Sequence, residues 1–146
     1  PRVIVDYAHT PDALEKTLAA LRPQCRGELI CLVGCGGDRD RGKRGQMGLA
    51  AVKGSDRVWF TSDNPRSEDP SAIIHDMLEP LKDPNSSRVH RQADRAKAIA
   101  EAIESAGADD IVLIAGKGHE QTQEINGEFL PFSDFAIVDQ LQSGKN

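Results

Sequence analysis

Short apolar runs alternate along the chain with longer stretches whose apolar residues recur at helical spacing. Five runs have the length and continuity of buried strands, at residues 3–5, 29–33, 57–61, 88–90 and 111–115. Buried strands that alternate with helices are typical of a mainly parallel sheet covered on both faces. The pattern therefore predicts one α/β domain, residues 1–146, with a Rossmann-like three-layer arrangement. We expect about six strands in the sheet, helices on both of its faces, and a C-terminal hairpin.

Capping and turn residues mark the ends of several of these elements. Thr10-Pro11-Asp12 has the form of an N-cap followed by proline at the first helical position. A helix over residues 94–106 is expected to end at Gly107, in the C-cap role. Asn126-Gly127 is the strongest hairpin-turn signal in the chain, within residues 124–132. Ser133-Asp134 is expected to cap a last helix.

Unusual polar stretches follow four of the apolar runs directly. They are DYAHTPD (6–12), GCGGDRDRGKR (34–44), TSDNPR (61–66) and GKGHE (116–120). The carboxyl ends of parallel strands lie at one edge of a sheet, which is where folds of this class bind ligands. We therefore expect the four stretches to gather into one functional site, because purely structural turns would be scattered over both ends of the sheet.

Composition narrows the class of partner. The chain has 146 residues and a net charge of −5, so nucleic acid is not expected as a partner. No run of about 18 apolar residues occurs, and no membrane partner is expected. Cys25, Cys31 and Cys35 are expected to be reduced core residues of a cytoplasmic protein. Because Pro1 stands almost inside a strand, we expect a piece of a longer protein.

The glycine-rich stretch nearly matches a phosphate-binding P-loop. Residues 37–44 fit G-x-x-x-x-G-K-[ST] except that Arg44 replaces the hydroxyl residue that would hold magnesium. Asp38 and Asp40 would also face phosphate oxygens, so a working P-loop is rejected. What remains is a basic loop that could bind a carboxylate or the outer phosphates of a nucleotide held elsewhere. The alternative is a merely solvated loop.

Two other familiar site patterns fail. Neither Gly34-Cys35-Gly36 nor Gly116-Lys117-Gly118 continues to the third glycine of a dinucleotide-binding turn. His119-Glu120 lacks the second histidine of a helical zinc site. The sequence therefore disfavours a nicotinamide dinucleotide fold and predicts no metal ligands.

The remaining polar residues suit small polar ligands. Tyr7 and His9 could stack on a nucleobase while Asp6 accepts from ribose hydroxyls, although packing at a strand end is the alternative. Arg66 offers a planar fork for a carboxylate, and Glu120 could hold an ammonium. An acid and an arginine placed for opposite ends of a zwitterion suggest an amino-acid pocket, with a surface ion pair as the alternative.

Together these stretches resemble the C-terminal domain of the Mur ligases. DYAHTPDALEKTL (6–18), GCGGDRDRGKR (34–44), TSDNPRSEDP (61–70), AGKGHE (115–120) and FSD (132–134) occur in family order and cover nearly the whole chain. Within the family, DNPR is the signature of members that add diaminopimelate rather than lysine. A related member that adds another amino acid, and a free-standing module that binds an anion or nucleotide without catalysis, stay open as alternatives.

The resemblance implies a three-domain ligase in peptidoglycan precursor synthesis. ATP and magnesium would be held mainly by a central P-loop domain, and the UDP-N-acetylmuramoyl dipeptide by an N-terminal domain, both absent from this chain. The chain alone should therefore ligate nothing. The resemblance assigns contacts with meso-diaminopimelate to Arg39, Asp63, Asn64, Pro65, Arg66, Gly116 and Glu120. It brings Asp6, Tyr7, His9, Lys43 and Arg44 near the nucleotide, and it assigns no catalytic residue.

Overall fold

Strands and helices alternate as far as Ala115, and a hairpin and a last helix follow. The structure, a computed structural model, describes residues 1–143. Its elements are β1 (Arg2–Asp6), α1 (Pro11–Leu21), the 3-10 helix η1 (Arg22–Gln24), β2 (Leu29–Cys35), α2 (Gly42–Gly54), β3 (Arg57–Ser62), α3 (Pro70–Leu78), β4 (Val89–Arg91), α4 (Arg95–Ser105), β5 (Ile111–Ala115), β6 (Thr122–Ile125), β7 (Glu128–Pro131) and α5 (Asp134–Ser143).

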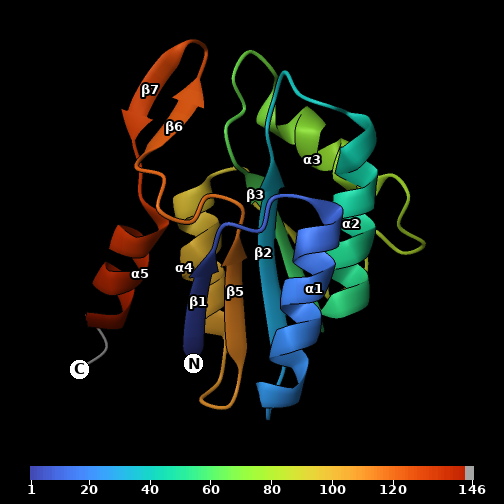
Figure 1. Cartoon of the computed structure of the whole chain (residues 1–146), viewed down its shortest axis with the longest axis vertical. Helices are drawn as coiled ribbons and strands as arrows, with labels where there is room; N and C mark the ends of the chain where they lie inside the picture. Colours follow the sequence, from blue (N-terminus) through green and yellow to red (C-terminus); the bar gives the residue numbers. More distant parts are fainter. Residues whose placement is uncertain (144–146) are drawn as a thin grey trace.

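The central sheet has five parallel strands in the order β1-β5-β2-β3-β4. The expected α/β class is confirmed, with five strands in the main sheet where about six were expected. After β5 the chain leaves the sheet, and β6 and β7 pair only with each other, so the hairpin stands apart above one end of the sheet (Figure 1).

Side chains of the central strands alternate between two apolar layers. In β2, Cys31 and Val33 pack among α1, α2 and α3, whereas Ile30 and Leu32 pack among α4 and α5. β5 and β3 divide their side chains in the same way, because successive residues of a strand point to opposite faces. The sheet is therefore buried on both sides, and this explains the continuous apolar runs of its strands.

The helix ends test the capping signals. The Thr10 hydroxyl accepts a hydrogen bond from the Ala13 N–H at 3.2 Å, so the predicted N-cap of α1 is confirmed. The expected role of Gly107 is wrong: α4 ends with Ala106 in extended backbone, and Gly107 is not among the glycines of positive φ. The Asp110 carboxylate accepts from the Gly107 N–H at 2.8 Å instead, so a side chain closes this loop.

The cysteines lie in or against one apolar layer of the domain. All three cysteines are free thiols; Cys31 is fully buried, and Cys25 and Cys35 are half-buried against the same layer. Within residues 1–143, every helix is too short or too polar to cross a membrane.

The site is positioned by the point at which the chain reverses its path across the sheet. Strands β2 and β5 are neighbours in the sheet. After β2 the chain continues to α2 on one face of the sheet, and after β5 it continues towards α5 on the other face. Loops that leave adjacent strands towards opposite faces open a crevice at the carboxyl edge of a parallel sheet. In Figure 1 the loops after β1, β2, β3 and β5 all lie at the same end of the sheet, the end at which the hairpin stands.

Candidate functional site: a charged hollow at the carboxyl edge of the sheet

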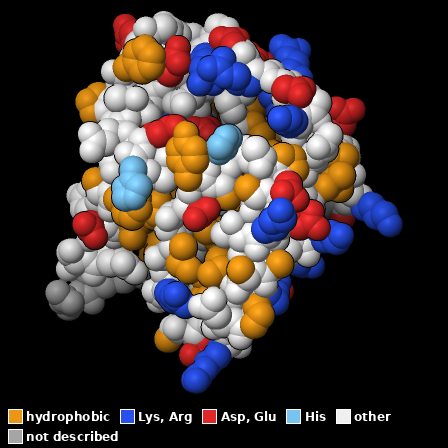
Figure 2. Space-filling view, viewed as in Figure 1, with side chains coloured by type: hydrophobic (Ala, Val, Ile, Leu, Met, Phe, Trp, Pro, Cys, Tyr) orange, Lys and Arg blue, Asp and Glu red, His pale blue; other side chains and the backbone are white. Residues whose placement is uncertain are grey.

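A hollow of about 440 Å³ lies between the loops that follow β1, β2, β3 and β5. Its lining includes most of the residues singled out from the sequence: Tyr7, His9, Arg39, Lys43, Arg44, Asp63, Asn64, Arg66, Gly116 and Glu120. In Figure 2, two histidines lie near acidic and basic side chains in the upper and middle part of the face shown, and other charged side chains lie elsewhere on that face. The prediction that the four polar stretches meet at one edge is thus confirmed.

A buried lysine joins the two loops that carry the acids of the hollow. Lys117 is fully buried, and its Nζ lies 3.3 Å from Asp63 Oδ1, 3.1 Å from Asn64 Oδ1 and 3.3 Å from Glu120 Oε1. An ammonium has three N–H donors, so these three acceptors satisfy it and offset its removal from water. Lys117 therefore fixes side chains from the loops after β3 and β5 relative to each other.

The hairpin holds the loop after β3 through further hydrogen bonds. Asn64 Oδ1 also accepts from the Glu124 N–H at 2.9 Å, and Gln123 Nε2 donates to the Asp63 carbonyl at 2.8 Å. The Asn64 carbonyl accepts from the Gly37 N–H at 2.8 Å, which joins the glycine-rich loop to the same segment. The amide of Asn64 is therefore part of the framework as well as of the lining.

Arg66 lies at the junction of the hairpin and the hollow. Its φ of +54° is unusual for a residue with a Cβ, and it is held by backbone bonds to Glu124 and Asn126 of 2.9 and 2.8 Å. Its Nε donates to the Glu124 carboxylate at 3.1 Å and its Nη1 to the Gly37 carbonyl at 2.9 Å. The guanidinium therefore sits against a carboxylate of this chain, at the edge of the hollow that it lines.

The hollow thus has acidic and basic parts. Asp63 and Glu120 supply carboxylates on the side of Lys117, whereas Arg66 and the exposed Arg39 supply guanidinium groups. Carboxylates hold an ammonium, and guanidinium groups hold a carboxylate. Such an arrangement can bind the zwitterionic end of an amino acid.

Gly116 shapes a wall of the hollow without supplying charge, whereas Pro65 lies outside the lining. Gly116 has a φ of +113° and its N–H donates to the Asp6 carbonyl at 3.0 Å. A Cβ there would lie only 3.3 Å from Asp63 Oδ2, in a backbone region that favours glycine. Pro65 does not line the hollow, and its carbonyl accepts from the Glu68 N–H at 3.0 Å.

The structure gives Arg44 a structural position. It is 2% exposed, and its terminal nitrogens donate to Glu68 Oε2 at 2.6 Å, to Asp76 Oδ2 at 2.9 Å and to the Gly36 carbonyl at 3.2 Å. The hydrogen bonds from Arg44 lower the pKa of Glu68 to about 2. Arg44 belongs to the first turn of α2, which begins at Gly42. Its contact with a nucleotide stays a prediction, since both terminal nitrogens are already occupied.

The candidate nucleoside residues lie at the mouth of the hollow. Tyr7 is half-exposed, its ring packs edge-on to His9 at 4.9 Å, and its hydroxyl donates to Glu120 Oε2 at 3.3 Å. The negative charge of Glu120 raises the pKa of the Tyr7 phenol. Asp6 is outside the lining, and its carboxylate accepts from the Ala8 N–H at 2.9 Å. Lys43 lines the hollow and is exposed.

The lining contains one thiol. Cys35 is the thiol that lines the hollow, and burial, followed by the charge of Asp63, raises its pKa to about 12, so it is a poor nucleophile. Within residues 1–143, no three His, Cys, Asp or Glu side chains are grouped closely enough to hold a metal ion.

Two buried cations of this region, Lys117 and Arg95, are not among the site residues predicted from the sequence. Lys117 lies inside GKGHE, where only the flanking Gly116 and Glu120 were given roles, so the motif itself was the available signal. Arg95, at the start of α4, pairs with Asp134 of α5 at 2.7 Å, with both side chains fully buried. Nothing in the local sequence around Arg95 separates it from a solvated helical arginine.

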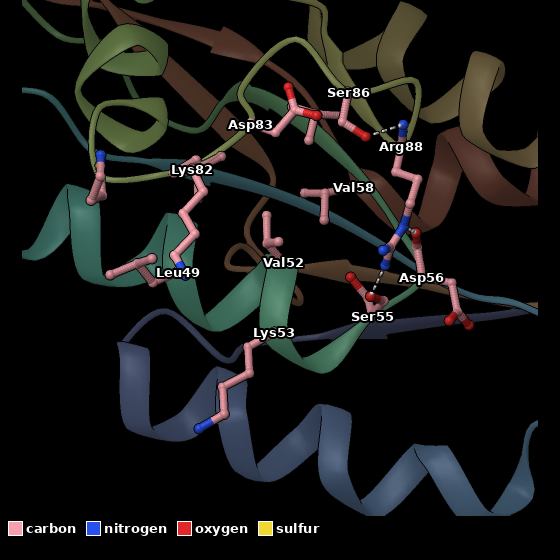
Figure 3. Close-up of a pocket in the computed structure, with 13 residues that line it drawn as sticks. Leu49, Val52, Lys53, Ser55, Asp56, Val58, Lys82, Asp83, Ser86 and Arg88 are labelled. Carbon is pink, nitrogen blue, oxygen red and sulfur yellow. Dashed lines mark hydrogen bonds between the residues drawn. The ribbon is translucent and has the colours of Figure 1, made fainter.

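A second hollow, of about 460 Å³, lies at the amino end of β3, away from these residues. Leu49, Val52 and Val58 form apolar walls, and Arg88 closes one end by donating to the Ser55 carbonyl at 3.1 Å and to the Asp56 carbonyl (Figure 3). None of the residues singled out from the sequence lines it.

Comparison with known proteins gives a family match. Residues 1–118 match the family model described as "Mur ligase, glutamate ligase domain". The chain is 57% identical over 134 residues to the "UDP-N-acetylmuramoyl-L-alanyl-D-glutamate--2,6-diaminopimelate ligase" of Coxiella burnetii, and equally to the protein of the same name from Pseudomonas putida. Each alignment covers 92% of this chain and 27% of the relative. The chain thus spans about a quarter of the length of these curated relatives.

A solved structure agrees with the sequence comparison. The structure titled as that of UDP-N-acetylmuramoyl-L-alanyl-D-glutamate--2, 6-diaminopimelate ligase superposes with a TM-score of 0.93 at 47% identity, covering 99% of this chain and 30% of that one. A folylpolyglutamate synthase/dihydrofolate synthase from Yersinia pestis superposes with a TM-score of 0.59 at 21% identity, which extends the likeness of fold alone.

Proposed function

The chain belongs to the Mur ligase family, and on that premise we propose that it is the amino-acid-binding domain of a ligase that adds meso-diaminopimelate to UDP-N-acetylmuramoyl-L-alanyl-D-glutamate. The named relatives at 57% identity support this choice within the family. Because the chain spans 27% of their length, we propose further that an N-terminal domain and a central P-loop domain supply the other substrates.

One observation carries the proposal. The carboxylates of Asp63 and Glu120, fixed by Lys117, share one hollow with the guanidinium groups of Arg39 and Arg66. Diaminopimelate differs from lysine by one further carboxylate at the end distant from the reacting amine. A half-buried arginine stabilises that carboxylate by pairing with it. When lysine binds, the guanidinium has no such carboxylate to pair with, and this costs binding free energy.

The contribution of this domain to the reaction is orientation. In the proposed reaction the amine of diaminopimelate attacks an acyl phosphate of the glutamate γ-carboxylate; the C–N bond forms, the C–O bond to phosphate breaks, and the amine loses a proton. Asn64, Arg39 and Arg66 hold the carboxylate at the distant end of diaminopimelate. Asp63 and Glu120 hold the ammonium at that same end. Fixing one end of the molecule directs the other end at the acyl phosphate, which is worth several orders of magnitude in rate for well-oriented reactants.

ATP is proposed to meet this chain only at the rim of the hollow. Tyr7 and His9 have exposed rings there, and the exposed ammonium of Lys43 can pair with a phosphate. Magnesium is proposed to be held mainly by the central P-loop domain, and within residues 1–143 no three His, Cys, Asp or Glu side chains are grouped to hold a metal ion.

Arg66→Ala in the full-length ligase tests the proposal. We expect kcat/KM for meso-diaminopimelate to fall by about 100-fold or more, since the site loses the group that pairs with the second carboxylate. The value for L-lysine should change little, so discrimination between the two amino acids collapses. Steady-state kinetics with both amino acids provide the measurement, and Arg26→Ala, an exposed arginine before β2, is the matched control.

Unchanged kinetics of the Arg66→Ala enzyme for both amino acids would reject the assignment. Residues 1–146 alone should form no peptide bond, because the P-loop domain proposed to hold most of the ATP is not among them. Tight binding of ATP by this chain alone in calorimetry would favour a free-standing nucleotide-binding module instead.

A further inference from the structure

Arg95 makes four hydrogen bonds while being 1% exposed. Its Nε and Nη2 donate to the two carboxylate oxygens of Asp134 at 2.9 and 2.7 Å. Its Nη1 donates to the Ser62 carbonyl at 2.9 Å, and Nη2 also donates to the Ala115 carbonyl at 3.2 Å. One planar group therefore joins the start of α4, the start of α5, and the ends of two strands of the central sheet.

The two carbonyls belong to residues that directly precede the loops of the proposed amino-acid site. Ser62 is the last residue of β3 and directly precedes Asp63, and Ala115 is the last residue of β5 and directly precedes Gly116. β3 and β5 are not neighbours, since β2 lies between them. Arg95 thus reaches across β2 and bonds the backbone at the start of two loops. These are the same two loops whose side chains Lys117 joins.

Stability alone is a weak explanation for this group. Removing both charges of an ion pair from water costs several kcal/mol per ion, and well-packed apolar replacements of buried pairs are often neutral or stabilising. The guanidinium has a property that no apolar side chain and no lysine shares: five N–H donors in a rigid plane, which can reach a carboxylate and two separate carbonyls at once. The geometry therefore favours a positioning role.

We propose that Arg95 is a positioning residue that sets the relative placement of the two amino-acid-binding loops and, through Asp134, couples that placement to the docking of α5. Its meaning for catalysis rests on the function proposed above. The predicted consequence is that α5, which does not line the hollow, contributes to amino-acid affinity.

Arg95→Lys separates positioning from charge. The ammonium keeps a positive charge beside Asp134 but cannot bond all four acceptors from one point. In the full-length enzyme we expect KM for meso-diaminopimelate to rise by about 10- to 100-fold, because displacements of about 1 Å in a site have effects of that size. KM for ATP and for the UDP-linked substrate should stay within about twofold.

Arg88→Lys is the matched control. Arg88 also donates to two backbone carbonyls, those of Ser55 and Asp56, but at the opposite end of β3 (Figure 3). If KM for diaminopimelate rises equally in both variants, the effect is a general loss of rigidity and the proposal fails. It fails also if KM in Arg95→Lys is unchanged.

A measurement on residues 1–146 tests the same inference without catalysis. Amide hydrogen exchange at Gly116, whose N–H bonds the Asp6 carbonyl, and at Glu124, whose N–H bonds Asn64, should accelerate at least about tenfold in Arg95→Lys and not in Arg88→Lys. If the wild-type enzyme does not use diaminopimelate, the proposed function fails while this exchange experiment still decides the role of Arg95.

Should Arg95→Lys fail to fold, the double variant Arg95→Met/Asp134→Leu replaces the ion pair by apolar side chains of similar size. We expect it to fold and to show the same rise in KM and in exchange. Wild-type values of both in the folded double variant would overturn the proposal.

Discussion

Three buried cations, Arg44, Arg95 and Lys117, organise the polar end of this domain. Each is at most 2% exposed, and each bonds at least one carboxylate. Each also joins segments that are distant in sequence: Arg44 bonds Glu68, Arg95 bonds Asp134, and Lys117 bonds Asp63. At the scale of single residues, therefore, the framework of the site is electrostatic, and its buried charges are paired as burial requires.

The pairing of Arg44 with Glu68 predicts a pH-dependent stability. The pKa of Glu68 falls from its ordinary 4.5 to about 2 in the folded chain, chiefly through hydrogen bonds from Arg44. A depressed carboxyl pKa adds stability above the unfolded value, and that stability is lost as the pH falls from 4.5 towards about 2. Glu68→Gln should therefore lower the free energy of unfolding at pH 7, by about 2 kcal/mol for a hydrogen bond to a charged group.

Urea unfolding of wild type and Glu68→Gln between pH 7 and pH 2.5 provides the measurement. The gap between their free energies of unfolding should narrow steadily below pH 4.5. Glu104→Gln, on the exposed side of α4, is the control and should show no such gap. A gap of constant size down to pH 2.5 would contradict the role assigned to the Glu68 charge.

At the scale of elements, the hairpin β6–β7 supports the loop that follows β3. Arg66 forms an isolated bridge with Ile125 next to the hairpin turn, and the Asn64 amide accepts from the backbone of β6. Asn126 and Gly127 both have positive φ, of 50° and 79°, as a tight two-residue turn requires. The small hairpin therefore stabilises the unusual backbone of Arg66.

Gly127→Ala should weaken this support. No atom lies within 4 Å of a Cβ built at Gly127, so the cost is that of placing an L side chain at φ +79°, about 1 kcal/mol. We expect a loss of that size in the free energy of unfolding, together with faster amide exchange at Arg66, whose N–H bonds the Glu124 carbonyl.

Gly107→Ala is the matched control for this prediction. Gly107 also follows a regular element, but its φ is not positive and a Cβ there would meet Asp110 at an ordinary 3.7 Å. The substitution should be neutral or slightly stabilising, because alanine restricts the unfolded chain. Equal losses for the two glycines would show that backbone conformation does not govern the difference.

At the scale of the whole molecule, one sheet divides two apolar layers that share its strands. Trp59, the single tryptophan, lies in the layer of α4 and α5, and Cys31 lies in the layer of α1, α2 and α3. Because β2, β3 and β5 supply side chains to both layers, one layer cannot open without loosening the other. We therefore expect one cooperative unfolding transition.

Two probes, one in each layer, test this cooperativity. Trp59 fluorescence and alkylation of Cys31, whose thiol is fully buried and has its pKa raised to about 12, should report the same midpoint in urea. The far-UV circular dichroism should follow the same curve. Separate midpoints for the two probes would mean that the layers are independent units.

Local features of the sequence predicted some ends of helices and strands correctly and one end wrongly. The N-cap at Thr10 and the turn at Asn126-Gly127 were predicted correctly, since each depends on the chemistry of adjacent residues. The end of α4 was not, because the Asp110 carboxylate completes a loop that Gly107 was expected to complete. A side-chain contact replaced the expected backbone signal.

The sequence by itself determined the α/β class, the edge at which the polar stretches meet, and the motifs that place the chain in its family. These follow from periodicity and from short motifs, which are properties of neighbouring residues. Which charges are buried and paired depends on the tertiary structure: Arg44 pairs with Glu68 and Asp76, Lys117 lies among the acids, and Arg95 pairs with Asp134. The reason is physical, because these partners meet only after non-neighbouring strands are placed in one sheet, and burial then fixes which polar groups must pair.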